Sequence, residues 1–218
     1  MSRHTHLELG RLSVRMAAQC LRVETHLLAV FSALLSESRS HGESLASADE
    51  AIDQEEVLIE EECLKIIALH QPTGIDLRRL ATFLKANNDL ERIADHATNV
   101  ARALSHLPAV TLLPQATALL VRRASEAFQL ACRALTEHDL DAARAVLSGD
   151  DVIDALEDAL TGQARDLALN GAIPLDSAFE LARCAHDIER VADLAKNIAE
   201  DIIYLDTGDI VRHTRRTY

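Results

Sequence analysis

Residues 89–95, Asp-Leu-Glu-Arg-Ile-Ala-Asp, return later in the chain as residues 187–193, Asp-Ile-Glu-Arg-Val-Ala-Asp. The two stretches lie 98 positions apart and align without a gap, which indicates an internal repeat. Each copy contains Glu-x-x-x-Asp, and residues four apart in a helix lie on the same face, roughly 6 Å along the axis. Each copy therefore predicts a helix that presents two carboxylates in one direction.

The repeat extends upstream of both stretches. Residues 49–56 align without a gap with residues 150–157, at an offset of 101. Each of these segments carries Asp-x-x-x-Asp followed three residues later by Glu, which again gathers acids on one side of a helix. Because the two offsets differ by three, we expect the two halves to differ in the connection between these helices.

In the first half, a tight turn near Pro72 would join the two acidic helices in antiparallel order. Asp53 would then lie level with Glu91, because the midpoint of the two positions is residue 72. Asp49 and Asp95 share the same midpoint. The first half is therefore expected to bring four carboxylates to one level of a helical hairpin.

The second half repeats this arrangement. Asp154 and Glu189 share a midpoint inside the turn at 171–172, and so do Asp150 and Asp193. Four carboxylates in such a space repel one another, and bound cations would relieve that repulsion. Oxygen ligands suit hard cations such as iron(III), manganese, magnesium and calcium.

The sequence therefore predicts one metal site in each half. The first is expected on Asp49, Asp53, Glu91 and Asp95, with Glu56 near; the second is expected on Asp150, Asp154, Glu189 and Asp193, with Glu157 near.

The side chains beside these acids have their own expected roles. Arg92 and Arg190 each follow a Glu by one residue and point roughly 100° away from it, so we expect them to pair with carboxylates of neighbouring helices. His186 precedes Glu189 by one turn; we interpret it as a surface or supporting histidine, with a ligand role as the alternative. His96 is expected to make a structural polar contact.

Composition places the chain among all-α proteins. The 218 residues include only seven Gly, four Pro and no Trp, and Ala and Leu dominate. The formal net charge of −13 argues against nucleic acid as a partner. The four cysteines lack metal or redox spacing, which is typical of buried thiols in a reducing cytoplasm. No run of about 18 apolar residues occurs, so we expect no membrane span.

Apolar seams at steps of three and four predict six long helices. They are expected over residues 6–38, 45–70, 76–104, 114–137, 150–169 and 176–205, with Asp76 as the N-cap of the third helix. Residues 139–148 are interpreted as a break or a helix start. The predicted fold is all-α, with two tandem pseudo-symmetric three-helix bundles over residues 1–106 and 107–205 and a tail over residues 206–218.

These repeated segments resemble those of the PhoU family of phosphate-signalling proteins, over nearly the whole chain. Residues 68–72 and 76–78 also resemble the family's connection between the second and third helices. The sequence departs from the family where Ala94 and Ala192 replace a usual Gly, and its second connection lacks the Pro-x-x-x-Asp-Leu-Arg pattern.

The resemblance implies a PhoU-like fold and multinuclear metal clusters on the acidic faces. Iron is the first expectation for the metal, with manganese, zinc, magnesium or calcium as alternatives. The resemblance also implies a cytoplasmic negative regulator of phosphate uptake and phosphate-starvation signalling. Its expected partners are the ATPase of a phosphate ABC transporter and a sensor histidine kinase, with peripheral association at the membrane and homodimer formation as further expectations.

Two other classes of protein stay open. One is a metal-free helical adaptor whose acidic stripes dock a basic partner. The other is a carboxylate-bridged di-iron enzyme in a helical bundle, which uses Glu-x-x-His on two helices. No Glu in the sequence is followed three residues later by His, and no nucleophile with a base or phosphate-binding Gly loop is found. We therefore predict that the protein is not an enzyme.

Overall fold

Helices account for the regular structure of the described chain. The computed structural model describes residues 3–36, 45, 49–108 and 111–208. Its helices are α1 (Arg3–Leu35), α3 (Glu50–His70), α4 (Ile75–His106), α5 (Ala116–Glu137), α6 (Leu140–Leu147), α7 (Asp150–Leu169) and α8 (Leu175–Thr207). The predicted all-α class with six long helices is confirmed, and α6 is a short seventh.

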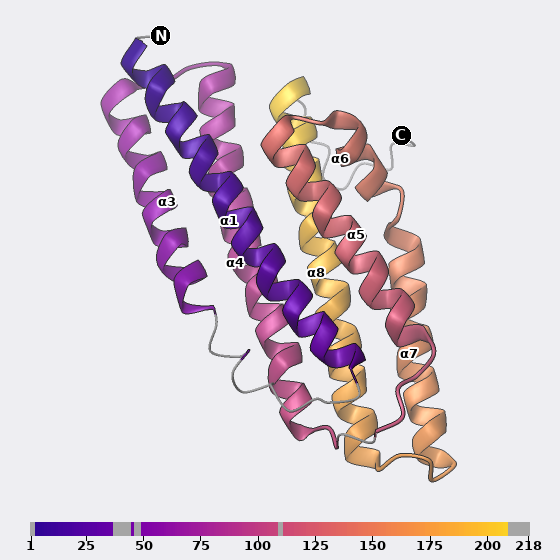
Figure 1. The fold of residues 1–218 in the computed structure, drawn as a ribbon. Helices are drawn as coiled ribbons and strands as arrows, with labels where there is room; N and C mark the ends of the chain where they lie inside the picture. Colours follow the sequence, from indigo (N-terminus) through magenta and orange to yellow (C-terminus); the bar gives the residue numbers. More distant parts are fainter. Residues whose placement is uncertain (1–2, 37–44, 46–48, 109–110, 209–218) are drawn as a thin grey trace.

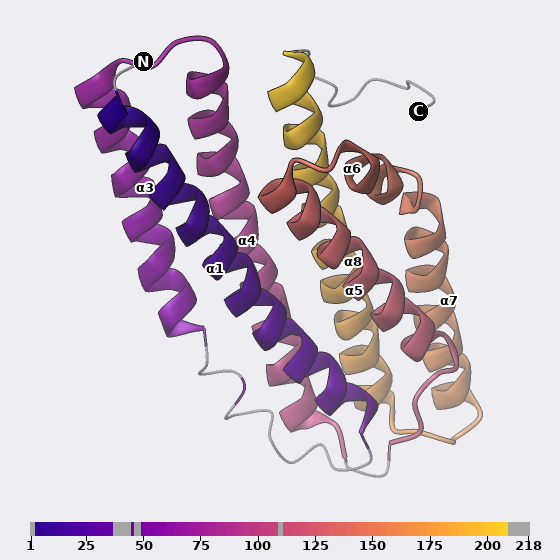
Figure 2. The ribbon, with the colours of Figure 1, turned by 45° about the horizontal axis from the view of Figure 1, so that its top comes forward.

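The long helices form two bundles that stand side by side (Figures 1 and 2). The first contains α1, α3 and α4, and the second contains α5, α7 and α8, with α6 at one end. The bundles meet mainly where α4 packs against α8, and α1 also packs against α5. The predicted arrangement of two tandem three-helix bundles is confirmed.

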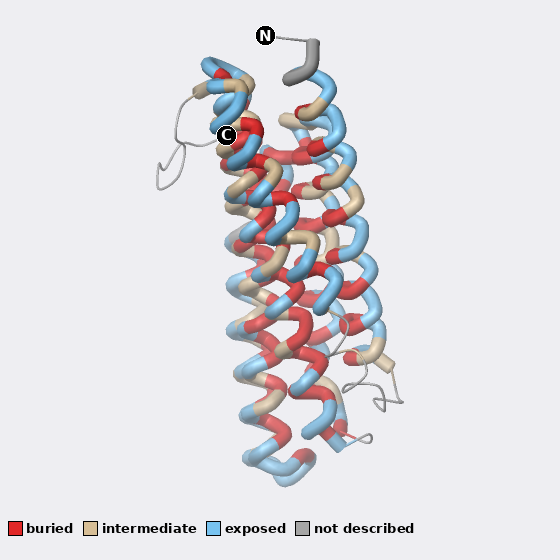
Figure 3. Tube along the Cα trace, turned by 90° about the vertical axis from the view of Figure 1, so that its left-hand side faces the viewer, coloured by how far each residue is buried: buried red, intermediate tan, exposed pale blue. Residues whose placement is uncertain are grey.

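The buried face of each helix is the apolar seam read from the sequence (Figure 3). Leu12, Val23 and Leu27 of α1 are fully buried, as are Leu90 and Ile93 of α4. Burying a side chain of this size is worth about 1.5–3 kcal/mol. The buried residues of both bundles form one continuous core, so the contact between the bundles is apolar as well.

One described helix, α1, is long and apolar enough to cross a membrane by length and composition alone. The most apolar 18 residues within His6–Leu35 pass that test, and 44% of them are buried inside the bundle. Because α1 packs against α3, α4 and α5, we interpret it as a core helix.

The loops from α3 to α4 and from α7 to α8 set the register of two antiparallel hairpins. Gln71 adopts a left-handed conformation, with φ of 45°, and its N–H donates to the oxygen of Ile67. Gly171 has φ of 70°, which glycine adopts without steric cost. Ala172 then donates back to the oxygen of Leu167 at 2.9 Å, a bond typical of a helix end. Both turns lie at the positions predicted from the sequence repeat.

Several helix boundaries differ from those predicted. Gly74, rather than Asp76, is the N-cap of α4, and Asp76 lies in the first turn, where its charge favours the positive helix end. Asp49 is the N-cap of α3, so this helix begins later than predicted. Most residues between α1 and α3 lie outside the described residues, as do residues 209–218 of the predicted tail.

Residues 139–148 contain the helix α6. Asp139 caps it, because its Oδ1 accepts a hydrogen bond from the N–H of Ala142 at 2.9 Å. Its Oδ2 also pairs with Arg133 of α5 at 3.0 Å. The cap thus ties the start of α6 to the end of the preceding helix.

Candidate metal centres

Two hydrogen bonds across the first hairpin show how α3 faces α4. Asn87 Nδ2 donates to the backbone oxygen of Glu56 at 2.8 Å and lies 3.4 Å from its Oε1. Nearer the open end, Thr98 Oγ1 donates to Asp49 Oδ2 at 3.0 Å. Both pairs have midpoints close to residue 72, so the predicted antiparallel register is confirmed.

The first hairpin gathers the predicted carboxylates closely enough that they affect one another's pKa. Burial raises the pKa of Glu91, and the negative charges of Asp95, Asp53 and Glu56 raise it further. Burial also raises the pKa of Asp53, with added contributions from Asp49 and Asp95. None of these five carboxylates forms an ion pair with the described Lys, Arg or His residues. Arg92 offsets part of the charge at Glu91, but the repulsion from the other acids exceeds it, so the group is a concentration of negative charge.

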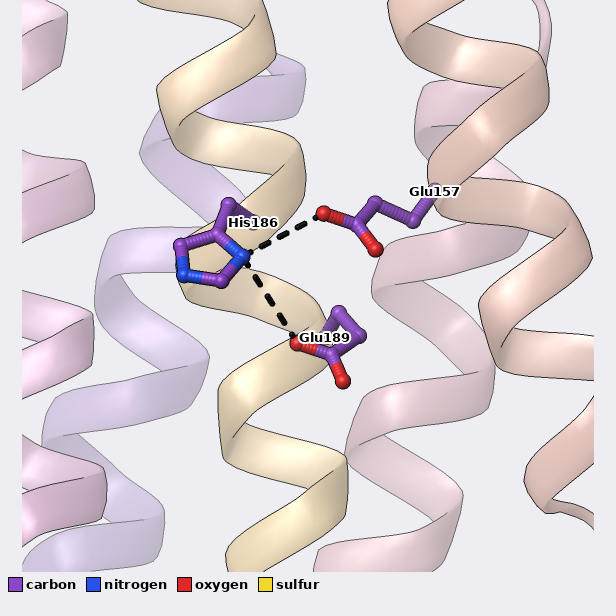
Figure 4. Close-up of side chains that lie close together, drawn as sticks. All are labelled: Glu157, His186 and Glu189. Atoms are coloured by element: carbon purple, nitrogen blue, oxygen red, sulfur yellow. Dashed lines mark hydrogen bonds and ion pairs between the residues drawn. The ribbon is translucent and has the colours of Figure 1, made fainter.

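The second hairpin brings acids from α7 and α8 together around a histidine (Figure 4). Burial raises the pKa of Glu189 to about 8, with further contributions from Asp193 and Glu157. His186 Nδ1 lies 3.3 Å from Glu157 Oε1 and 3.8 Å from Glu189 Oε2. The ligand atoms of this trio all lie within 4.8 Å of one another, and no other His, Cys, Asp or Glu trio of the described residues meets that distance.

The other two predicted acids of the second hairpin are less informative. Asp154 is exposed on α7. Asp150 begins α7, and its side chain lies outside the described residues. Glu157 and Asp193 therefore lie close enough to Glu189 to affect its pKa. The roles of Asp150 and Asp154 as ligands stay predictions.

The prediction for the two arginines is wrong. Arg190 pairs with Asp193 of its own helix at 2.5 Å, and Arg92 lies 3.7 Å from Asp89, also on its own helix. In both pairs the acid is three residues away, a spacing at which helical side chains meet. Arg190 thus reduces the negative charge at one edge of the second site.

The prediction for His96 as a structural contact is confirmed. Its Nδ1 donates to Asp187 Oδ1 at 2.8 Å, and Asn99 Nδ2 lies 3.5 Å from the same oxygen. His96 and Asn99 belong to α4 and Asp187 to α8, so the contact joins the two bundles.

Three residues that hold the first site in place were missed from sequence. Thr98 lies between Asp49 and His26, whose Nε2 is 3.0 Å from the Thr98 hydroxyl. Burial lowers the pKa of His26, although Asp49 offsets part of that effect. Asn87 and Thr98 lie four residues before and seven residues after Glu91, so helical spacing could have found them. His26 comes from α1, and no sequence signal points to it.

The donor chemistry of both hairpins fits cations. The first offers five carboxylates that form no ion pair with the described basic residues, which suits hard ions bound by oxygen. The second offers two carboxylates and an imidazole nitrogen whose ligand atoms lie within 4.8 Å of one another. Among the described residues, only the second hairpin brings three such ligand atoms within 4.8 Å of one another.

Comparison with known proteins agrees with this architecture. The family model described as the PhoU domain matches twice, at residues 14–104 and 118–202. The chain belongs to the PhoU family. Each PhoU domain therefore contains one of the two acidic hairpins.

Relatives and solved structures of the PhoU family match over most of the chain. A phosphate-specific transport system accessory protein PhoU homolog of Deinococcus radiodurans is 32% identical, over 85% of this chain and 88% of that protein. PhoU homolog 1 of Thermotoga maritima is 30% identical, over 94% and 90%. The crystal structure of the phosphate transport system regulatory protein PhoU from Streptococcus pneumoniae superimposes with a TM-score of 0.87 at 26% identity, covering 95% of this chain and 99% of that one.

Proposed function

We propose that this protein is a metal-binding regulator of phosphate uptake that works by binding partners rather than by catalysis. The regulatory role is supported by the length of chain over which the family similarity extends. It covers both PhoU domains and nearly the full length of relatives named as accessory proteins of phosphate-specific transport systems.

In this proposal the protein is cytoplasmic and couples a phosphate ABC transporter to a sensor histidine kinase as a negative regulator. Two bundles of similar build offer two similar docking faces, which suits a protein with two partners. A net charge of −13 disfavours nucleic acid as the target. The regulation therefore reaches gene expression through the kinase.

The pathway is tested by deleting the gene and measuring a reporter of phosphate-scavenging genes in phosphate-rich medium. Expression should rise in the deletion strain and return to the repressed level when the gene is restored. Equal repression with and without the gene would contradict the proposed pathway.

The second part of the proposal is that each hairpin binds metal, with iron as the first candidate. Its support is the concentration of negative charge in the first hairpin and the closely spaced ligand trio of the second. A cation would offset the repulsion that raises the carboxylate pKa values. The residues concerned are Asp49, Asp53, Glu56, Glu91, Asp95, Asp150, Asp154, Glu157, Glu189 and Asp193.

Metal binding is tested by elemental analysis after growth with iron, manganese and zinc, and by thermal melting with and without a chelator. A ligand at 100 times its dissociation constant stabilises the folded state by about 2.7 kcal/mol, or roughly 5–10 °C for a chain of this size. The Glu91→Gln/Asp95→Asn variant should lose part of this response. The control Glu61→Gln/Asp158→Asn makes the same charge change at exposed positions outside the proposed sites and should keep it.

Absence of metal after supplementation would contradict the metal sites. The acidic stripes would then favour the alternative of a metal-free adaptor that docks a basic partner. An unchanged chelator response in Glu91→Gln/Asp95→Asn would show that the first site is misplaced.

A further inference from the structure

The two hairpins differ at one position next to the predicted ligands. Asn88 lies one turn before Glu91 in the first repeat, and His186 occupies the corresponding place before Glu189. Both side chains are exposed. The second acidic site therefore has an imidazole where the first has an amide, and the first offers only amide and carboxylate oxygens.

One nitrogen of the His186 imidazole faces two carboxylates rather than one (Figure 4). Its Nδ1 is 3.3 Å from Glu157 Oε1 and 3.8 Å from Glu189 Oε2. Ligand atoms that surround one metal ion at roughly 2.1 Å stand roughly 3.0–3.4 Å apart. Small side-chain movements would therefore allow all three atoms to bind one ion.

Other histidines of this protein show what a plain histidine–carboxylate hydrogen bond looks like. His96 lies 2.8 Å from Asp187, and His70 lies 2.6 Å from Glu8. Such charge-assisted bonds typically measure about 2.7–2.9 Å. The contacts of His186 are longer, and one nitrogen makes both of them. This pattern favours an imidazole that binds the same metal ion as the two carboxylates.

The neighbouring base Arg190 compensates the charge of Glu189 only in part. Arg190 is the nearest arginine in sequence to Glu189, and its guanidinium is directed to Asp193 at 2.5 Å. Glu189 is largely buried, with 13% of its side chain exposed, so water screens its charge poorly. A cation bound by the trio would compensate the negative charge of its carboxylates.

We propose that His186 Nδ1, Glu157 and Glu189 form a mixed nitrogen–oxygen site that selects Zn²⁺ or a similar transition metal over Ca²⁺ and Mg²⁺. Imidazole suits zinc, iron, nickel and copper, whereas carboxylates alone suit calcium, magnesium and manganese. The two PhoU domains thus carry sites of different metal preference. This inference rests on the proposed metal binding and adds selectivity to it.

The test compares metal-free wild type with His186→Asn, which copies the residue of the first repeat, and with the reciprocal Asn88→His. Titration calorimetry with Zn²⁺ and with Ca²⁺ reports each affinity. His186→Asn should weaken Zn²⁺ binding by at least about tenfold, since even indirect supports of metal ligands are worth that much. Its Ca²⁺ binding should change less than about twofold. Asn88→His should strengthen Zn²⁺ binding at the first hairpin.

Zinc X-ray absorption spectra provide a readout of the nitrogen ligand itself. Imidazole scattering should be present in wild type with one equivalent of Zn²⁺ and lost in His186→Asn. His106→Asn removes an exposed histidine at the end of α4 and should leave the spectrum unchanged. Melting in chelator should be the same for all these variants, because each replaced side chain is exposed.

The outcomes separate this inference from the proposed function. If wild type binds Zn²⁺ and His186→Asn binds it equally well, the nitrogen ligand is refuted while metal binding stands. An equal loss of Zn²⁺ and Ca²⁺ in that variant would refute the selectivity. If wild type takes up no metal, both this inference and the metal part of the proposed function fall.

Discussion

The hydroxyl of Thr98 links the buried core to the acidic surface. It donates to Asp49 Oδ2 at 3.0 Å and lies 3.0 Å from the Nε2 of His26, which is 6% exposed. Thr98→Val keeps the shape and removes both contacts. We expect the free energy of unfolding in urea to fall by about 1–3 kcal/mol, because buried polar groups lose a partner.

Thr117 provides a matched control for Thr98. It is 1% exposed, and its hydroxyl has no hydrogen-bond partner among the described residues. Thr117→Val should therefore leave stability unchanged or raise it, because an unpaired buried hydroxyl is replaced by a methyl group. Equal effects of the two substitutions would contradict the role given to the Thr98 hydroxyl.

The thiol of Cys63 is predicted to be unreactive in the folded protein. It is fully buried on α3, and burial raises its pKa to about 12. Because the thiolate is the reactive form, only about one molecule in ten thousand would carry it at pH 8. Alkylation of Cys63, measured by mass spectrometry at pH 8, should become fast only in denaturing urea. Ser105→Cys, at an exposed position, should be labelled without denaturant.

At the scale of elements, α6 depends on the carboxylate of Asp139. The hydrogen bond from the Ala142 N–H lowers the pKa of Asp139 below its ordinary value of 3.8, and Arg133 adds to that effect. A carboxyl whose pKa is lower in the folded state contributes stability above its unfolded pKa. That stability is lost as the pH falls through the folded pKa.

We therefore expect Asp139→Ala to lower the melting temperature at pH 7, and the gap to wild type to close below about pH 4. Circular dichroism melts at several pH values would show this. The control Asp141→Ala removes an acid whose side chain is 92% exposed and should produce a smaller gap. A gap for Asp139→Ala that persists unchanged at low pH would contradict the carboxylate's role as the cap.

At the scale of the whole molecule, α4 and α8 hold the two bundles together. Lys85 of α4 lies 3.1 Å from Oδ1 of Asp201, whose side chain is only 3% exposed, and Thr82 donates to the Asp201 backbone oxygen at 3.3 Å. The His96–Asp187 contact lies farther along the same interface. These polar contacts accompany an apolar core that continues from one bundle into the other.

Because the core is shared, we expect the metal-free chain to unfold in one cooperative transition. Cys63 reports on the first bundle and Cys184 on the second, and both are buried. Their labelling in increasing urea, in the presence of a chelator, should have the same midpoint as the loss of helical circular dichroism. Separate midpoints for the two thiols would show that the bundles unfold independently.

The sequence by itself determined the helical class, the repeat and the register of both hairpins. The apolar seams are the buried faces, because a helix with one apolar side can exclude that side from water only by packing it. The register followed from the turn positions, since each antiparallel hairpin pairs residues at equal distance from its turn. Glu157 and His186 also have their midpoint at 171–172, so the same rule predicts that they lie level with each other, as their contact shows.

Only the tertiary structure decided what depends on side-chain direction and on contacts between distant helices. Arg190 could reach acids on several helices, and its actual partner, Asp193, depends on rotamers that sequence spacing leaves open. His26 supports the first site only because α1 packs beside α4. The pairing of α4 with α8 joins surfaces from the two halves, and the repeat pattern within each half carries no information about it.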